Sequence, residues 1–217
     1  MEALRVLRLV RQKEQDNSEA KYSDYDIQGA VNETLRYLNI SLANKGNEYL
    51  QKIEVYDQNL INAQITAENE ENAEDEEYIP KDLVDFAETG VALPEDYISL
   101  VDVQRTSDGY HLHPASSLFE VRSDDGYGKY IIMGDKIYIK GKAFQLCYYR
   151  VIPPVKDFKE DKIDLPEICL DPVVKLTRLV LNNADVDTMT QAVNTAVERI
   201  MPRRRYANSR QKMPFSL

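Results

Sequence analysis

The sequence has few of the residues that build catalytic and metal sites. Its 217 residues include two histidines, two cysteines and no uninterrupted apolar run of about 18 residues, the length that a membrane-spanning helix needs. No Ser/His/Asp set, phosphate-binding loop or metal cluster stands out. We therefore predict that the protein is not an enzyme, that it holds no cofactor or metal, and that it has no membrane partner.

The two histidines, His111 and His113, would share one face of a short strand, as a metal-binding pair does. No carboxylate or cysteine lies beside them at ligand spacing, and a zinc site needs three or four ligands. Two exposed strand histidines are therefore expected.

The two cysteines, Cys147 and Cys169, form no Cys-x-x-Cys motif. Because free cysteine is usually buried, we expect two reduced core thiols in a cytosolic protein, with a disulfide between them as the alternative. The first segment, Met1–Gln12, is not expected to be a signal peptide, since arginines interrupt its apolar residues.

Negative charge dominates the composition. The net charge is −10, which argues against broad nonspecific binding to nucleic acid but leaves room for a local basic arm. Much of this charge lies in the run 67–77, which has no glycine and so does not fit a calcium loop. We expect an exposed loop, with a cation site or a docking surface for a basic partner as the alternatives. Its acidic residues are Glu68, Glu70, Glu71, Glu74, Asp75, Glu76 and Glu77.

Two helices are expected in the first part of the chain. Residues 2–12 carry an apolar stripe and a second stripe at i+3 spacing, Arg5, Arg8 and Arg11. These arginines either form a solvated edge or contact an acidic partner, nucleic acid or a neighbouring subunit. The second helix, 23–43, has a capping box and a continuous apolar stripe, and Gly46 follows at the position of a left-handed cap. Lys52–Tyr56 then alternates as a strand does.

The region 91–150 predicts a small antiparallel β-domain. Three runs rich in valine, isoleucine, tyrosine and phenylalanine lie within Lys129–Arg150 and are separated by turns at Gly134-Asp135 and Gly141. We expect a three-stranded meander, whose last strand places Phe144, Leu146, Tyr148 and Arg150 on one face. Further strands are expected at Tyr97–Gln104, at Tyr110–His113 and at Leu118–Arg122.

The last part of the chain predicts two more helices and an arm. Asp171-Pro172 fits the start of a helix over 172–184, although a start at Pro166 with a kink at Pro172 is also open. The helix over 186–201 carries a near-heptad apolar seam and ends before Pro202. The tail is either a solubilising terminus, an arm that orders on a partner, or a nucleic-acid contact. Its candidate contact residues are Arg203, Arg204, Arg205, Tyr206, Arg210, Lys212 and Phe215.

Together these elements predict an α+β fold: a helical bundle with a small antiparallel β-domain, forming one domain over 1–202, and an extended C-terminal arm over 203–217. Four segments follow one another in an order that can be compared with known families. They are YSDYDIQGAVNE at 22–33, VALPEDYISLVDV at 91–103, CYYRVIPP at 147–154 and IDLPE at 163–167.

In this order the segments resemble the head–tail adaptor, or connector, proteins of tailed bacteriophages, particularly the short-tailed ones. The resemblance covers most of 22–201, and the acidic run 67–77 and Pro172 depart from the family's pattern. It implies a virion protein of the neck that forms a ring, commonly of twelve copies, below the portal ring and around the DNA exit channel. It further implies that the arm 203–217 docks on the portal protein and that a tail or second neck-ring protein is a further partner.

On this resemblance DNA passes through the channel without sequence-specific binding, and the protein resides in the host cytoplasm during assembly. Net acidity suits a conduit, because phosphates should slide past it. Another ring protein of the same neck or tail, and a non-viral oligomeric interaction protein, stay open as alternatives.

Overall fold

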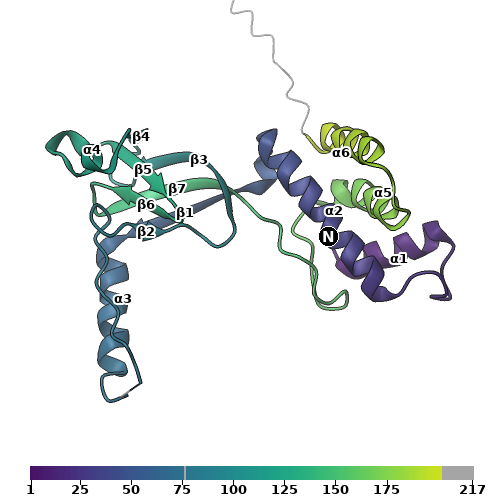
Figure 1. The fold of residues 1–217 in the computed structure, drawn as a ribbon, viewed down its shortest axis with the longest axis horizontal. Coiled ribbons are helices and arrows are strands. Elements are labelled where there is room, and N and C mark those ends of the chain that lie inside the picture. Colours follow the sequence, from purple (N-terminus) through teal and green to yellow (C-terminus); the bar gives the residue numbers. More distant parts are fainter. Residues whose placement is uncertain (76, 202–217) are drawn as a thin grey trace, which may run out of the picture. The chain divides into compact units, whose positions relative to one another are not determined.

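The structure is a computed structural model, and it describes residues 1–75 and 77–201. They form an α+β fold, as the sequence predicts, in two compact units (Figure 1). The first unit comprises Met1–Ser41 and the chain from Val155, and the second comprises Leu42–Pro154. The predicted single domain over 1–202 thus falls into two units, because the β-region is inserted between helices that come from both ends of the chain.

The first unit is helical. Its elements are α1 (Ala3–Glu14), α2 (Asp24–Asn44), the 3-10 turn η3 (Glu167–Cys169), α5 (Leu170–Leu181) and α6 (Val186–Ile200), and the last residues of α2 belong to the second unit. The predicted apolar stripes form its core, since Val31, Leu35 and Leu38 of α2 are buried. Val186, predicted to begin the seam of α6, is instead exposed at the first turn of that helix.

Both predicted caps of α2 are present. The backbone N–H of Asp26 donates to Ser23 Oγ at 3.1 Å, and the backbone N–H of Ser23 donates to Asp26 Oδ2 at 2.9 Å. This reciprocal pair satisfies amide groups that the first turn leaves without helical partners. At the other end Gly46 has a φ of +71°, and its N–H donates to Ala43 O at 3.0 Å.

The start of α5 differs from the predicted cap at Asp171. The helix begins at Leu170 and directly continues η3, so Pro172 is its third residue. A proline costs little there, because the N–H groups of the first turn have no helical acceptor. An N-cap at Asp171 is therefore wrong, whereas the alternative of an earlier start agrees with the structure to within a residue, since helical structure begins as η3 directly after Pro166.

The second unit contains two small sheets. Strands β1 (Gln51–Asp57), β7 (Ala143–Arg150) and β3 (Tyr97–Arg105) form an antiparallel sheet in the order β1-β7-β3. The second sheet has the order β2-β6-β5-β4, with a parallel β4–β5 pair. Its strands are β2 (Val91–Ala92), β4 (His113–Pro114), β5 (Lys129–Met133) and β6 (Lys136–Ile139). The unit also holds α3 (Gln58–Glu71), α4 (Leu118–Arg122) and the 3-10 turns η1 (Glu48–Leu50) and η2 (Asp124–Gly126).

The predicted meander is correct for its strands and wrong for one pairing. Strands β5 and β6 form the expected hairpin, whereas β7 leaves it and becomes the central strand of the other sheet. The alternation of β7 is confirmed, since Phe144, Leu146 and Tyr148 are all buried. Strands β1 and β3 satisfy the backbone of β7 on both sides, so a third pairing with β6 is impossible.

Two further predictions are corrected. Residues 118–122 form the helix α4 instead of a strand, because Ser117 caps it and accepts from the backbone N–H of Glu120 at 3.3 Å. The first part of the predicted acidic loop, 67–71, belongs to α3, which begins directly after the cap residue Asp57. Serine or aspartate immediately before a helix is a recognisable start signal in both cases.

Both cysteines are free thiols, as predicted. Cys169 is buried, and this burial raises the pKa of its thiol to about 11. Cys147 is half-buried on the outer face of β7, so only Cys169 is a true core thiol.

Candidate functional site: charged interaction surfaces

The three arginines of α1 do not form one surface. Arg5 and Arg8 are exposed, and Arg5 pairs with Glu167 at 2.7 Å, whereas Arg11 is buried. Residues spaced by three drift about 60° around a helix with each step, because one turn takes 3.6 residues. Over two steps this drift carries Arg11 into the core side. The predicted contact stripe therefore reduces to Arg5 and Arg8.

Arg11 instead joins the end of α1 to the start of α2. Its guanidinium contacts the carboxylates of Asp16 and Asp24 and donates to Tyr22 O at 3.2 Å. Asp16 also accepts from the backbone N–H groups of Lys21 and Tyr22, and these hydrogen bonds lower the pKa of its carboxyl. We call this cluster the clamp: its ion pairs and hydrogen bonds all lie within the helical unit and hold the 15–23 connection in place.

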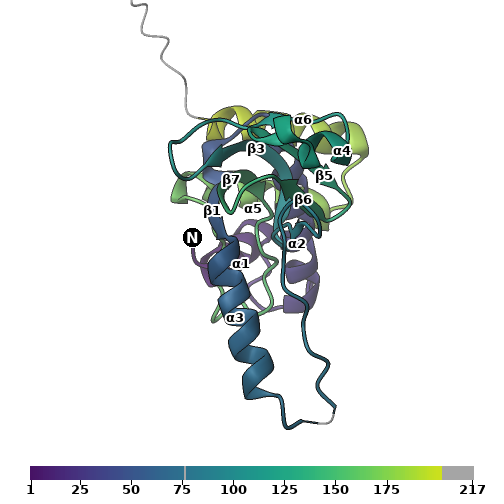
Figure 2. The same ribbon diagram turned by 90° about the vertical axis from the view of Figure 1, so that its left-hand side faces the viewer.

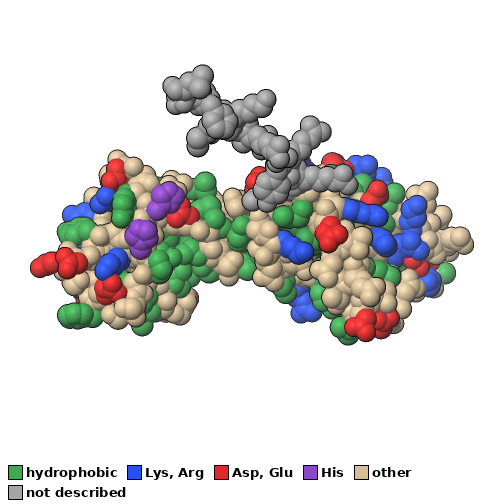
Figure 3. All heavy atoms as spheres, turned by 90° about the horizontal axis from the view of Figure 1, so that it is seen from above, with side chains coloured by type: hydrophobic (Ala, Val, Ile, Leu, Met, Phe, Trp, Pro, Cys, Tyr) green, Lys and Arg blue, Asp and Glu red, His purple; other side chains and the backbone are tan. Residues whose placement is uncertain are grey.

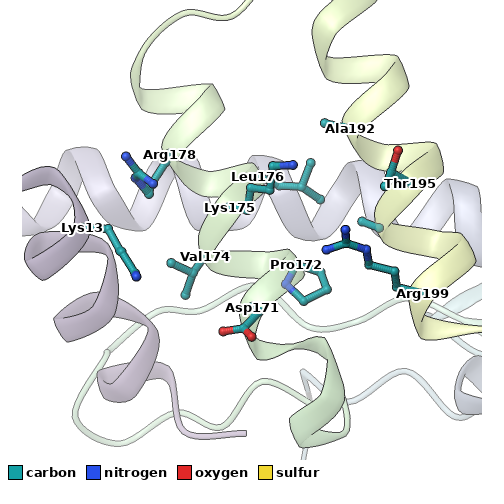
Figure 4. A pocket seen from close by; sticks show the side chains of 11 residues that line it. Lys13, Asp171, Pro172, Val174, Lys175, Leu176, Arg178, Ala192, Thr195 and Arg199 are labelled. Carbon is teal, nitrogen blue, oxygen red and sulfur yellow. The ribbon is translucent and has the colours of Figure 1, made fainter.

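A basic groove lies between α1, α5 and α6 of the helical unit (Figure 4). Its volume is about 300 Å³, the lower end of the range for ligand pockets. In Figure 4, Lys13 of α1 and Arg199 of α6 extend towards α5 from opposite sides, and Lys175 lies between them. The groove is lined by Lys13, Asp171, Pro172, Val174, Lys175, Leu176, Arg178, Ala192, Thr195, Ala196 and Arg199.

The charge of this groove is largely uncompensated. Arg178 Nε lies 2.5 Å from Glu14 Oε1, a carboxylate whose side chain is only 6% exposed. Burial would raise the pKa of Glu14, but hydrogen bonds from Arg178, Lys21 and Asn182 outweigh burial and lower it, so the pair stays ionised. Within the described residues Lys13, Lys175 and Arg199 form no ion pair. Among the residues that the structure describes, three cations without ion pairs and one acid, Asp171, therefore line the groove.

Reasoning from the sequence missed this groove. Lys175 and Arg178 are three residues apart on α5, which is a weak local signal that they share a face. Lys13 and Arg199 come from opposite ends of the chain, and only the packing of α1 and α6 against α5 brings them together.

An acidic arm projects from the sheets of the second unit. It consists of α3 and the chain that returns along it to Phe86 (Figures 1 and 2). Helix α3 has no fully buried residue, and only Ile61 of the helix and Val84 of the returning chain are described as packing against the core of the unit. Side-chain amides hold the arm together along its length: Asn62 exchanges two hydrogen bonds with the backbone of Val84, and Asn69 exchanges two with the backbone of Lys81.

The end of this arm carries exposed acids without counter-ions. Glu68 pairs with Lys81, but no ion pair involves the acids that follow within the described part of the chain. We call these residues the acidic tip: Glu70, Glu71, Glu74, Asp75 and Glu77. The exposure predicted for the acidic run is thus confirmed for these five acids, whereas Glu68 is half-buried and the residues up to Glu71 are helical.

A half-buried polar cluster lies on the β1-β7-β3 sheet. The hydroxyl of Tyr148 donates to Asp96 Oδ1 at 2.7 Å, and Lys52 Nζ lies 2.8 Å from Glu54 Oε1 and 3.1 Å from Asp96 Oδ2. Burial would raise the pKa of Asp96, but the hydrogen bonds from Tyr148 and Lys52 outweigh it and lower the pKa. The charged carboxylates, held by a cation and a hydroxyl, link β1 and β7 to Asp96 at the start of β3.

The histidines lie on the surface, as predicted (purple in Figure 3). His111 Nδ1 is 2.7 Å from Asp102 Oδ2, and His113 meets the ring of Tyr110 edge-on. No group of three or more metal-ligating side chains occurs within 1–75 and 77–201. Over the same residues, no helix combines the length and apolar character needed to cross a membrane.

The predicted arm 203–217, with Arg203, Arg204, Arg205, Tyr206, Arg210, Lys212 and Phe215, lies outside the described residues. On the face seen in Figure 3, lysine and arginine side chains gather over the helical unit. Comparison with protein-family models finds no match to the chain, and a search of curated proteins finds no significant relative. The assignment of a function therefore depends on the chain's own residues.

Proposed function

We propose that this protein is a structural virion protein: a head-to-tail adaptor whose copies form a ring between the portal and the tail of a bacteriophage, with DNA passing through the ring. The observation that carries the proposal is the order of the four segments at 22–33, 91–103, 147–154 and 163–167. Each segment is short and no single one is diagnostic, so the proposal depends on the order in which the four occur.

The positions of these segments in the fold support the proposal. The first begins α2, the second spans β2 and most of β3, the third ends β7, and the fourth leads into η3 and α5. Asn32 of the first segment accepts from the backbone N–H of Val155 at 2.8 Å and donates to Val155 O at 2.9 Å. Since Val155 directly follows the third segment, a motif residue fixes the point at which the chain re-enters the helical unit.

The charges of the chain also suit a ring around DNA. A ring closed by rotation needs two different faces on each subunit, and this chain carries a basic groove and an acidic tip. A conduit for DNA should not retain phosphates, which fits a net charge of −10. The basic arm 203–217 supplies arginines and two aromatic residues for docking on the portal.

Imaging of the complexes that copurify with the tagged protein from its native source tests the proposal. We expect a symmetric ring stacked on a larger portal ring, and the image would also give the copy number. A ring that contacts tail proteins alone would move the protein to another level of the neck. Particles without this protein, or a complex with an enzyme, would refute the proposal.

Deletion of Arg203–Leu217 tests the docking arm separately. We expect the truncated chain to keep its folded structure by circular dichroism and to be lost from particles. As a control, the variant Arg203→Lys/Arg204→Lys/Arg205→Lys keeps the charge of the arm and should still be incorporated. Normal incorporation of the truncated chain would refute a role of the arm in docking.

A further inference from the structure

We propose that the basic groove of α1, α5 and α6 binds the acidic tip of a second copy of this chain. The contact would be heterologous, with the groove of one copy against the tip of the next. The inference rests on the proposed function in one respect, that such contacts close into a ring. The pairwise contact itself needs neither portal nor DNA.

The groove has the charge and the size for a carboxylate-bearing segment. Lys13, Lys175 and Arg199 converge on it without ion pairs in the described part of the chain. Its volume of about 300 Å³ equals that of roughly ten waters, which is room for a few side chains but not for a folded element. Alanines and a threonine of α6 form one wall and leave the cations accessible.

The acidic tip carries the complementary charge, and this negative charge is uncompensated within the described part of the chain. Glu70 and Glu71 lie in the last turn of α3, where the helix dipole is negative and where that helix has no basic residue. Glu74, Asp75 and Glu77 follow within the turn that ends the arm. Their mutual repulsion and the unfavourable dipole would both be relieved by cations from outside the arm.

The arm is built to present this tip. The paired amides of Asn62 and Asn69 hold the returning chain against α3, and Ile61 packs the start of this helix against the core of the unit. Acids held on a helix and on the hydrogen-bonded turn that follows it lose less conformational entropy on binding than the acids of a flexible loop would. The projecting arm of one copy would thus place its acidic tip in the basic groove of the neighbouring copy.

Two other contacts are conceivable. The basic tail 203–217 could bind the acidic tip in place of the groove, and DNA phosphate could bind the groove in place of the tip. We favour the groove as the site of the tip because its cations are fixed on three packed helices. We favour a second copy because a head-to-tail assembly requires two complementary surfaces on one chain.

A disulfide-trapping experiment tests the contact directly. One full-length copy carries Thr195→Cys in the groove, and a differently tagged copy carries Glu74→Cys in the tip. We expect a mixed disulfide dimer when the two are oxidised together at low salt. Gln64→Cys, which lies further back on α3, replaces Glu74→Cys in the matched control and should not be trapped. No dimer, or equal trapping of the control, would overturn the proposal.

Two further variants distinguish the proposed contact from an internal contact and from a contact with the basic tail. A single chain with both cysteines that closes on itself in place of dimerising would show an internal contact and overturn the role of a second copy. Loss of trapping in copies that end at residue 202 would assign the contact to the basic tail and also overturn the proposal. Unchanged trapping in the truncated copies would support the groove.

Charge reversal gives the energetic test. The groove variant Lys13→Glu/Lys175→Glu/Arg199→Glu and the tip variant Glu70→Lys/Glu71→Lys/Glu74→Lys should each weaken self-association by roughly tenfold, with recovery when both are mixed. Lys45→Glu/Lys156→Glu/Lys159→Glu, three exposed charge reversals outside the groove that change the net charge by the same amount, is the control. If the groove variant leaves self-association unchanged and instead weakens binding of a double-stranded oligonucleotide, the groove is a phosphate site and the proposal fails.

The outcomes distinguish this contact from the proposed function. Rings in particles that survive charge reversal would refute the contact and leave the adaptor proposal standing. Trapped dimers of a protein that never enters particles would refute the adaptor proposal and leave the contact standing.

Discussion

Asn62 of α3 and Val84 of the returning chain pair through both of their polar groups. The Asn62 amide nitrogen donates to Val84 O at 2.9 Å, and its oxygen accepts from the Val84 N–H at 2.8 Å. The side chain thus replaces the neighbouring strand that an extended segment would otherwise need. Asn69 with Lys81 and Asn32 with Val155 repeat this arrangement.

Asn62→Ala should therefore release the acidic arm. The half-buried N–H and C=O of Val84 lose their partners, which costs about 1–3 kcal/mol of local stability. We expect faster hydrogen exchange over 77–85, with little change in β7. Asn59→Ala is the matched control, because it is exposed on the same helix and gains the same helix propensity. Equal exchange in both variants would contradict the role of Asn62.

Tyr148→Phe should destabilise the second unit. It removes the hydroxyl that donates to the carboxylate of Asp96, and we expect a loss of about 1–2 kcal/mol in the free energy of unfolding. Urea denaturation measures this loss. Tyr138→Phe in β6 is the control, since its hydroxyl has no hydrogen bond to another described residue. A Tyr148→Phe protein as stable as the Tyr138→Phe control would show that the hydroxyl contributes nothing.

Glu120 should titrate unusually low. Lys129 Nζ lies 2.5 Å from its Oε1, and together with the N–H and hydroxyl of Ser116 it lowers the pKa of Glu120 to about 2. Because the folded pKa is below the ordinary value of about 4.3, the stabilisation is complete above that value and is lost as the pH falls through about 2. Carboxyl NMR gives the midpoint. Lys129→Gln should move it upward, and an unchanged midpoint would exclude the ion pair as the cause.

Arg11→Ala should destabilise the helical unit far more than Arg8→Ala. Removing Arg11 leaves the carboxylate of Asp16, whose side chain is 2% exposed, without its cation, so the loss of unfolding free energy should clearly exceed that of Arg8→Ala. Arg8 is exposed, so its truncation should change the unfolding free energy by less than about 0.5 kcal/mol. Urea denaturation of the two variants compares them, and similar midpoints would show that the clamp is dispensable.

Local patterns predicted the elements better than their partners. The apolar period of 23–43 and the cap at Ser23 gave α2 almost to its ends, and the alternation at 143–150 gave both β7 and its buried face. The same patterns missed α3, whose weak apolar stripe buries nothing, and took α4 for a strand although Ser117 and Glu120 form a capping-box pattern. Both errors concern short or exposed helices, where period is a poor guide.

The sequence by itself determined the charges and the periodic elements: an acidic chain, an acidic run at 67–77, arginines along 5–11 and helices at both ends of the β-region. Only the tertiary structure decided that Arg11 is buried, that β7 joins β1 and β3, and that Lys13, Lys175 and Arg199 share one groove. The physical reason is the distance along the chain between the residues that interact. Period and capping act between residues a few positions apart, whereas burial, strand pairing and a convergence of cations depend on contacts between residues that lie far apart in the chain.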